Sequence, residues 1–179
     1  MKDGEQPSKP AGFSLRTHRP GDMGWITHRH GVLYATEYGW DERFEALVAR
    51  VTADFIDHYD GDLEKCWIAE SNNGGEFLGC VMLVNDRERS RTAKLRLLLV
   101  EPSARGLGVG RGLVRQCVRF AQEAGYERVV LWTNSVLTSA RYIYQSEGFE
   151  MVQMEEHETF GVKLFGETWQ LVIPIRTEE

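Results

Sequence analysis

Cysteine is scarce in this chain of 179 residues, and what there is cannot form local pairs. Cys66, Cys80 and Cys117 are odd in number, lie far apart and form no C-x-x-C pair. A secreted disulfide framework is therefore excluded. Buried thiols in a reducing compartment are typical of such cysteines, and a catalytic thiol is the less favoured alternative.

Long apolar runs and a surplus of positive charge are also absent. No apolar stretch approaches the ~18–20 residues that cross a membrane, and the polar start MKDGEQPSKP lacks the apolar core of a secretory signal. The net charge of −6 argues against a free-standing nucleic-acid binder, which usually has a basic surface. We therefore expect a cytoplasmic protein with no membrane or nucleic-acid partner.

The hydrophobic content of 42% and aromatic content of 11% are sufficient for one ordinary core. Residues 1–12 contain two prolines and alternating charges and predict a flexible lead-in. Residues 13–175 predict a single domain, and residues 176–179 form a polar tail.

Alternation and helical periodicity predict a mixed α/β fold. Asp22 is expected to cap a poor first helix that Gly24 and Gly31 interrupt, and Asp41 a stronger second one. A third helix runs to about Ala124, and a short fourth ends at Glu147. Strands are expected at 13–19, 65–70, 77–85, 93–100, 128–133, 149–154 and 168–175. The order predicts a central mixed sheet of about seven strands flanked by about four helices.

The segment RGLGVG, from Arg105 to Gly110, lies directly between a predicted strand and a predicted helix. A helix N-terminus presents unpaired N–H groups and a partial positive charge, and glycines allow a phosphate to approach the backbone. Arg111 and Arg115 add cations on the helix that follows. The alternative is a tight turn beside solvated arginines. The glycine spacing does not fit a dinucleotide-binding fingerprint, and no Gly-Lys-Ser/Thr of a P-loop is present.

The spacing that fits is R-x-x-G-x-G, and a second pattern, A-x-x-x-Y-x-x-x-G-F, begins at Ala140. With both motifs, residues 13–175 resemble the GNAT superfamily of acetyl-CoA-dependent N-acetyltransferases. Residues 28–44 and 131–149 resemble more narrowly the acetyltransferase half of bacterial fusions to a MarR-type DNA-binding domain. Since the chain has no room for that second half, we expect the enzyme module alone.

The resemblance implies where acetyl-CoA binds, with no metal required. The backbone of Leu98, Leu99 and Val100 would pair with the pantetheine arm. The turn would hold the pyrophosphate through the backbone N–H groups of Arg105, Gly106, Leu107, Gly108, Val109, Gly110 and Arg111. Asn134, at the end of the next strand, would contact the cofactor or the acceptor. Many relatives carry an asparagine where this chain has Leu137.

The resemblance also implies direct attack of an amine on the thioester in a ternary complex. Tyr144 matches the tyrosine that protonates the leaving thiolate, although a core aromatic is the structural alternative. Many relatives place a basic carboxylate on the strand before the turn, but this chain has Lys94 and Arg96 there. We therefore chose Glu37, in the segment expected between the first two helices, as the candidate base; its alternative is a solvated loop residue.

Tyr34, Tyr38 and Trp132 are expected to line the acceptor pocket, which would suit a cationic primary amine on a small molecule or peptide. His28 and His30 lack the further ligands of a metal site. The alternative to an enzyme is a non-catalytic acyl-CoA-binding sensor or interaction module. The acceptor's identity is open, and the C-terminal strands suggest a possible homodimer.

Overall fold

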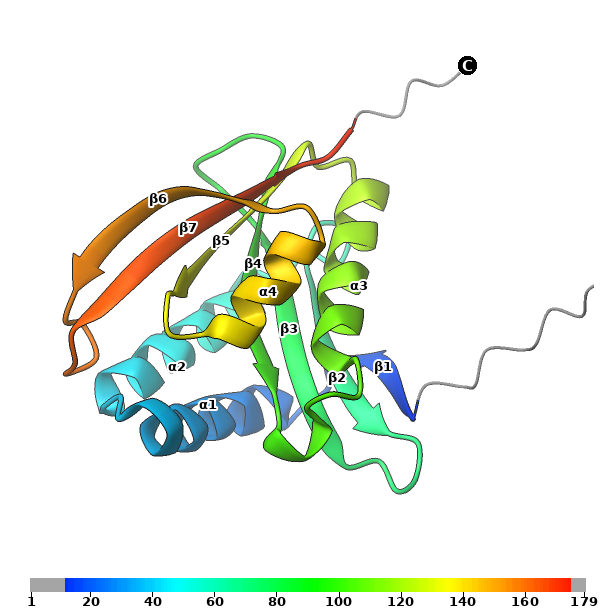
Figure 1. The fold of residues 1–179 in the computed structure, drawn as a ribbon. Helices are drawn as coiled ribbons and strands as arrows, with labels where there is room; N and C mark the ends of the chain where they lie inside the picture. The colour runs from blue at the N-terminus through cyan, green and yellow to red at the C-terminus, as the bar shows by residue number, and fades with distance from the viewer. Residues whose placement is uncertain (1–11, 175–179) are drawn as a thin grey trace, which may run out of the picture.

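A computed structural model describes residues 12–174 of the chain, a single body built on a seven-stranded sheet (Figure 1). Residues 1–11 and 175–179 lie outside the described residues, and so do nearly all of the predicted lead-in and the whole predicted tail. The strands are β1 (Phe13–Thr17), β2 (Lys65–Ser71), β3 (Phe77–Asn85), β4 (Thr92–Val100), β5 (Arg128–Asn134), β6 (Glu150–His157) and β7 (Leu164–Val172). The helices are α1 (Asp22–Tyr38), α2 (Glu42–Asp57), α3 (Val109–Glu123) and α4 (Thr138–Ser146), with a 3₁₀ turn at Pro102–Ala104.

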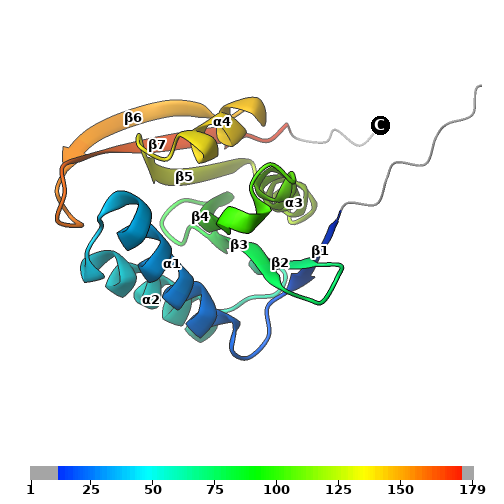
Figure 2. The same cartoon turned by 60° about the horizontal axis from the view of Figure 1, so that its bottom comes forward.

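The sheet has the strand order β1-β2-β3-β4-β5-β7-β6. Neighbouring strands are antiparallel except β4 and β5, which are parallel because α3 carries the chain across between them. Helices α1 and α2 cover one face of the sheet, and α3 and α4 lie on the other (Figure 2). The predicted mixed α/β architecture is therefore confirmed.

Helix α1 corrects the sequence prediction, because it runs without interruption through Gly24 and Gly31 to Tyr38. Gly31 lies where α2 comes closest: a Cβ atom there would meet a carboxylate oxygen of Glu45 at 2.8 Å. This glycine therefore allows α1 and α2 to pack together rather than breaking the helix. The N-cap of α1 is Gly21 and not Asp22, as the sequence had suggested. The Asp22 carboxylate accepts hydrogen bonds from the Arg16 guanidinium instead.

Other element ends follow the sequence more closely. The Asp41 carboxylate accepts a hydrogen bond from the Arg43 N–H and caps α2, as predicted. The C-terminal hairpin differs in extent, since β6 continues to His157 and β7 begins at Leu164 rather than Thr168. β6 is the edge strand of the sheet, and all of its residues but His157 are exposed, so apolar alternation gave little guidance to its end.

The feature that shapes the site is a bulge in β4. The pairing of β3 with β4 shifts between Cys80 and Met82, and Leu97 adopts a positive φ of 55° there. The parallel pairing with β5 covers only residues 92–95 of β4, so the two strands separate before the bulge. The bulge therefore leaves the last part of β4 with an edge that faces no strand.

Two apolar clusters pack on the two faces of the sheet, one beneath α3 and α4 and one beneath α1 and α2. All three cysteines are buried in them. Burial raises the pKa of the Cys66 thiol to about 12 and also raises those of Cys80 and Cys117. These thiols have the character of core residues, as expected, rather than of nucleophiles. No helix within residues 12–174 is both long and apolar enough to span a bilayer.

Candidate active site

Two cavities meet where β4 and β5 separate. The larger, called the groove here, has a volume of about 690 Å³ and runs between the end of β4, the Gly-rich turn and α4. The smaller, called the inner pocket, has a volume of about 100 Å³ and lies between the β4–β5 opening and α1 and α2. Four residues line both cavities and mark their junction: Tyr34, Leu98, Leu137 and Ala140.

The turn at one end of the groove has the geometry of an anion site. Gly106 and Gly108 have φ values of 79° and 81°, which L side chains rarely adopt, and Gly108 is the N-cap of α3. The helix's first backbone hydrogen bond runs from the Gly112 N–H to the Gly108 carbonyl. The N–H groups just before Gly112 are therefore available to a ligand. Leu107 is 60% exposed and does not line the groove, whereas Val109 is buried and lines it.

The three arginines expected around this turn all have carboxylate partners. Arg105 donates two hydrogen bonds to Glu37, at 2.6 and 2.9 Å. Arg111 and Arg115 both lie against Glu147, the residue that follows α4, at 3.5 and 3.0 Å. The structure thus joins Arg105 and Glu37, for which the sequence had suggested separate roles.

Glu37 also differs from its expected setting. It belongs to the last turn of α1, not to a segment between helices, and it lines the groove rather than the inner pocket. Tyr38 accompanies it in the groove. Of the three residues predicted for an acceptor pocket, only Tyr34 and Trp132 line the inner pocket. Trp132 is 42% exposed, as expected for a pocket wall rather than a core residue.

Tyr144 faces the inner pocket from α4, which an ion pair between the half-buried Arg141 and the buried Glu167 joins to the sheet. Arg141 donates a 2.9 Å hydrogen bond to Glu167, which also accepts one from the Trp169 indole. The Tyr144 ring packs against Phe149 and Trp169 and is 4% exposed. Burial raises the pKa of its hydroxyl, chiefly through desolvation, so the group stays protonated at neutral pH. It can donate a proton but cannot accept one.

Asn134 lines the inner pocket with Trp132 rather than the groove. Its side-chain oxygen accepts a 2.7 Å hydrogen bond from His157 Nε2, and the His157 ring packs against Trp132. This arrangement favours the acceptor side of the two roles considered for Asn134. His157 therefore supports one wall of the pocket from β6.

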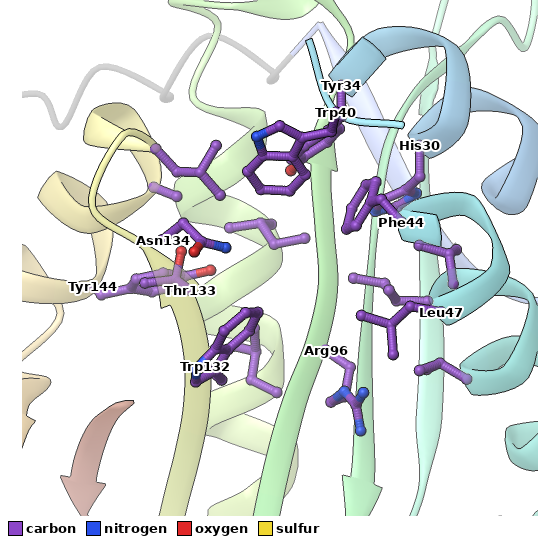
Figure 3. A pocket seen from close by; sticks show the side chains of 17 residues that line it. His30, Tyr34, Trp40, Phe44, Leu47, Arg96, Trp132, Thr133, Asn134 and Tyr144 are labelled. Carbon is purple, nitrogen blue, oxygen red and sulfur yellow. The ribbon is translucent and has the colours of Figure 1, made fainter. Parts of the chain in front are cut away.

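Two polar residues of the inner pocket need separate mention: Arg96, which sequence reasoning did not assign to the site, and His30, for which it left an acceptor-site or a surface role open. Figure 3 shows Arg96 on β4 at one end of the pocket and His30 on α1 near the other. His30 Nδ1 donates to the Ile26 carbonyl, which leaves Nε2 buried and without a hydrogen-bond partner among the described residues. Desolvation lowers the pKa of His30 to about 4, so the ring is neutral. The signal for Arg96 was present: it was the departure from an expected carboxylate.

Comparison with known proteins identifies the family. The model of the acetyltransferase (GNAT) family matches residues 32–149, which include α3, α4 and the strands that form both cavities. The chain belongs to the GNAT acetyltransferase family. Its fold therefore agrees with the resemblance that the Gly-rich turn and the Tyr144 motif suggested.

Relatives of known name are matched over part of their length. The chain is 30% identical over 113 residues to N-acetyltransferase 8 of Homo sapiens, covering 62% of this GNAT protein and 50% of that relative. It is 32% identical over 108 residues to N-acetylaspartate synthetase of Danio rerio, covering 60% and 37% respectively. The chain thus spans half or less of the length of these relatives.

Solved structures match almost throughout. Spermidine N-acetyltransferase from Vibrio cholerae, solved with CoA and spermine, has a TM-score of 0.69 at 18% identity and covers 90% of this chain and 95% of its own. The protein yncA of Salmonella typhimurium, solved with its cofactor acetyl-CoA, has a TM-score of 0.69 at 18% identity, with 93% and 97% covered. At this identity the likeness concerns the fold.

Proposed function

We propose that this GNAT protein transfers the acetyl group of acetyl-CoA to a primary amine within a ternary complex. The observation that carries the proposal is the meeting of the two cavities at the β4–β5 opening. The groove has an anion-binding helix terminus at one end, and the inner pocket has a buried, protonated Tyr144 in its wall. A long phosphate-bearing substrate and a small second substrate would meet at that junction.

In this proposal the backbone from Gly106 to Arg111 binds the pyrophosphate, with Arg105 beside it. The free edge of Leu98, Leu99 and Val100 pairs with the pantetheine arm, since β5 does not occupy it. The thioester then lies at the junction of the two cavities. Phosphates would compete with Glu37 for Arg105, so cofactor binding would release the Glu37 carboxylate.

The amine nitrogen attacks the thioester carbonyl, a C–N bond forms and the C–S bond breaks. The departing thiolate takes a proton from Tyr144, and the amine gives up its own. A lysine-like amine costs ~4–5 kcal/mol to deprotonate at pH 7, so a base or an ordered water chain toward Glu37 is part of the proposal. The names of the relatives, N-acetyltransferase 8 and N-acetylaspartate synthetase, support an amine acceptor.

A second candidate function is a sensor that binds acyl-CoA without turnover. The observation favouring it is that the lining of the inner pocket, within residues 12–174, has no carboxylate, and that Glu37 is held by Arg105. The cytoplasmic location, the homodimer and the narrower relation to MarR-type fusions stay predictions.

Thiol release from acetyl-CoA, measured with a panel of amines, amino acids, peptides and amino sugars, tests the enzyme. Calorimetry with acetyl-CoA on the folded protein provides the binding control. Amine-dependent release that Tyr144→Phe reduces supports the transferase. Binding without release supports the sensor, and the absence of binding rejects both.

A further inference from the structure

Arg96 gives the inner pocket a single positive charge. Its side chain projects from β4 at the end of the pocket away from Tyr34 and Trp40, with Trp132 and Leu47 near it (Figure 3). The position lies two residues before Leu98, which marks the junction with the groove.

Arg96 has no hydrogen bond or ion pair with another residue in the described range 12–174. This distinguishes it from Arg29, Arg105 and Arg141, whose guanidinium groups all lie against carboxylates within 3 Å. Asp54 of α2 acts on Arg96 only at longer range, and its carboxylate already contacts His58 and Arg87. Burial lowers the pKa of Arg96, but an arginine side chain stays charged in proteins.

The neighbouring cation on β4 is not available to the pocket. The Lys94 ammonium lies 3.2 Å from the buried carboxylate of Asp86, and Lys94 does not line the cavity. His30, which does line it, is neutral. The charge that a bound acceptor would meet in the inner pocket is therefore that of Arg96.

Most of the other residues in the pocket wall are apolar or aromatic, and the polar ones, His30, Thr133 and Asn134, carry no charge. Trp40 and Phe44 form one side and Trp132 the other, and the Trp40 and Phe44 rings are almost completely buried. A desolvated guanidinium beside such a wall is matched by a ligand with one anionic group and an apolar body. A polycation would instead bring like charges together without a compensating carboxylate.

We propose that the acceptor is a free amino acid with an apolar side chain, whose carboxylate binds Arg96 while its amine points toward the cavity junction. This inference rests on the proposed acetyl transfer and names the acceptor class for that site. The small volume of the inner pocket, about 100 Å³, favours a small molecule over a peptide segment. The proposed amino acid replaces the cationic acceptor that the sequence alone had favoured.

The positive charge would also assist the chemistry. A nearby cation disfavours the protonated form of an amine, so Arg96 lowers the pKa of the bound ammonium group. The same residue would then select the acceptor by its carboxylate and increase the fraction of amine that is neutral. The transfer itself still forms the C–N bond and breaks the C–S bond, with Tyr144 supplying the thiolate proton.

Matched acceptor pairs test the inference on the full chain. Thiol release is measured with the natural amino acids and, for phenylalanine and leucine, with the amines that lack only the carboxylate, 2-phenylethylamine and 3-methylbutylamine. We expect kcat/KM to be at least about tenfold higher for the amino acids, equivalent to about 1.4 kcal/mol. Arg96→Gln should remove that preference, and Arg96→Lys should keep part of it.

Arg119→Gln is the matched control, because Arg119 is exposed on α3, away from both cavities, and loses the same charge. A second readout, independent of turnover, is the binding of the amino acids to the CoA-loaded protein, measured by calorimetry. Binding that Arg96→Gln weakens at least about tenfold and Arg119→Gln leaves unchanged supports the site even if no transfer occurs.

The two proposals fail in different ways. If the decarboxylated amines are acetylated as well as the amino acids, and Arg96→Gln changes neither, the acceptor class is wrong while the transferase stands. If no amine is acetylated but amino acids bind through Arg96, the transferase fails and the site stands. If no amino acid binds or reacts, the inference is overturned.

Discussion

Removal of one oxygen atom from Tyr144 tests the proposed mechanism most directly. Phenylalanine keeps the ring, its contacts with Phe149 and Trp169, and its burial, so the packing of α4 is unchanged. The hydroxyl has no hydrogen bond to another residue in the described part of the chain. Its loss should therefore change the free energy of unfolding by less than about 1 kcal/mol. Truncation to alanine would instead cost ~3–5 kcal/mol and confuse folding with catalysis.

The expected effect on catalysis is much larger. A positioned general acid contributes ~10²–10⁴-fold, so Tyr144→Phe should lower kcat by at least about a hundredfold, or ~2.7 kcal/mol. The measurement is thiol release with acetyl-CoA and an accepted amine at saturation. Since burial raises the pKa of Tyr144, its deprotonation should cause no loss of activity up to pH ~10.

Tyr126→Phe provides the matched control. The Tyr126 hydroxyl donates a 2.8 Å hydrogen bond to the Leu63 carbonyl, far from both cavities. Its loss should cost about 1 kcal/mol of stability and leave kcat unchanged. A Tyr144→Phe protein whose kcat stays within twofold of the parent, with acetyl-CoA binding intact, would refute Tyr144 as the acid.

Three further predictions concern the surroundings of the site. Arg105→Gln should raise the Kd of acetyl-CoA in calorimetry, and Glu37→Gln should lower it because Arg105 is freed. Weaker binding of acetyl-CoA by Glu37→Gln would contradict the idea that Glu37 and the phosphates compete for Arg105. Burial lowers the pKa of His30 to about 4, against ~6.5 when unfolded, so stability present above pH ~6.5 should fall toward pH 4 in urea unfolding, with about 3 kcal/mol of the fall due to His30. His30→Phe should remove that part, while His18, whose pKa burial also lowers, keeps its own contribution. Glu167→Gln should cost ~1–3 kcal/mol of unfolding free energy and lower kcat, because Arg141 no longer holds α4; unchanged stability would exclude that role.

The fold was largely predictable because local signals agree with the packing. Strands 77–85 and 128–133 are apolar runs that the structure buries at the centre of the sheet, and the Asp41 cap fixes the start of α2. The error at α1 has a tertiary cause. Gly31 suggests a helix break in isolation, but α1 packs along α2 there, and the Glu45 side chain of α2 lies against this glycine.

The candidate site was predicted less completely, because its charges are defined by partners distant in sequence. Glu37 and Arg105 are 68 residues apart, and no local pattern announces their ion pair. Tyr144 of the second motif lines a cavity, and the Gly-rich turn ends at the N-terminus of α3, but the roles assigned to both stay predictions. Tyr38 and Trp132 line different cavities because β4 and β5 diverge. The hydrophobic periodicity of the sequence does not predict how far two strands diverge.

In the proposed acceptor site, the charges on β4 connect recognition of the acceptor with removal of its proton. The resemblance predicts a carboxylate base on that strand, but the chain has Lys94 and Arg96 there. Lys94 is neutralised by Asp86, whereas Arg96 enters the inner pocket without a partner in the described chain. A carboxylate would attract an ammonium group and then take its proton. A guanidinium repels the ammonium form and binds an acceptor only through its carboxylate, so the neutral amine is favoured by the same charge that selects the substrate.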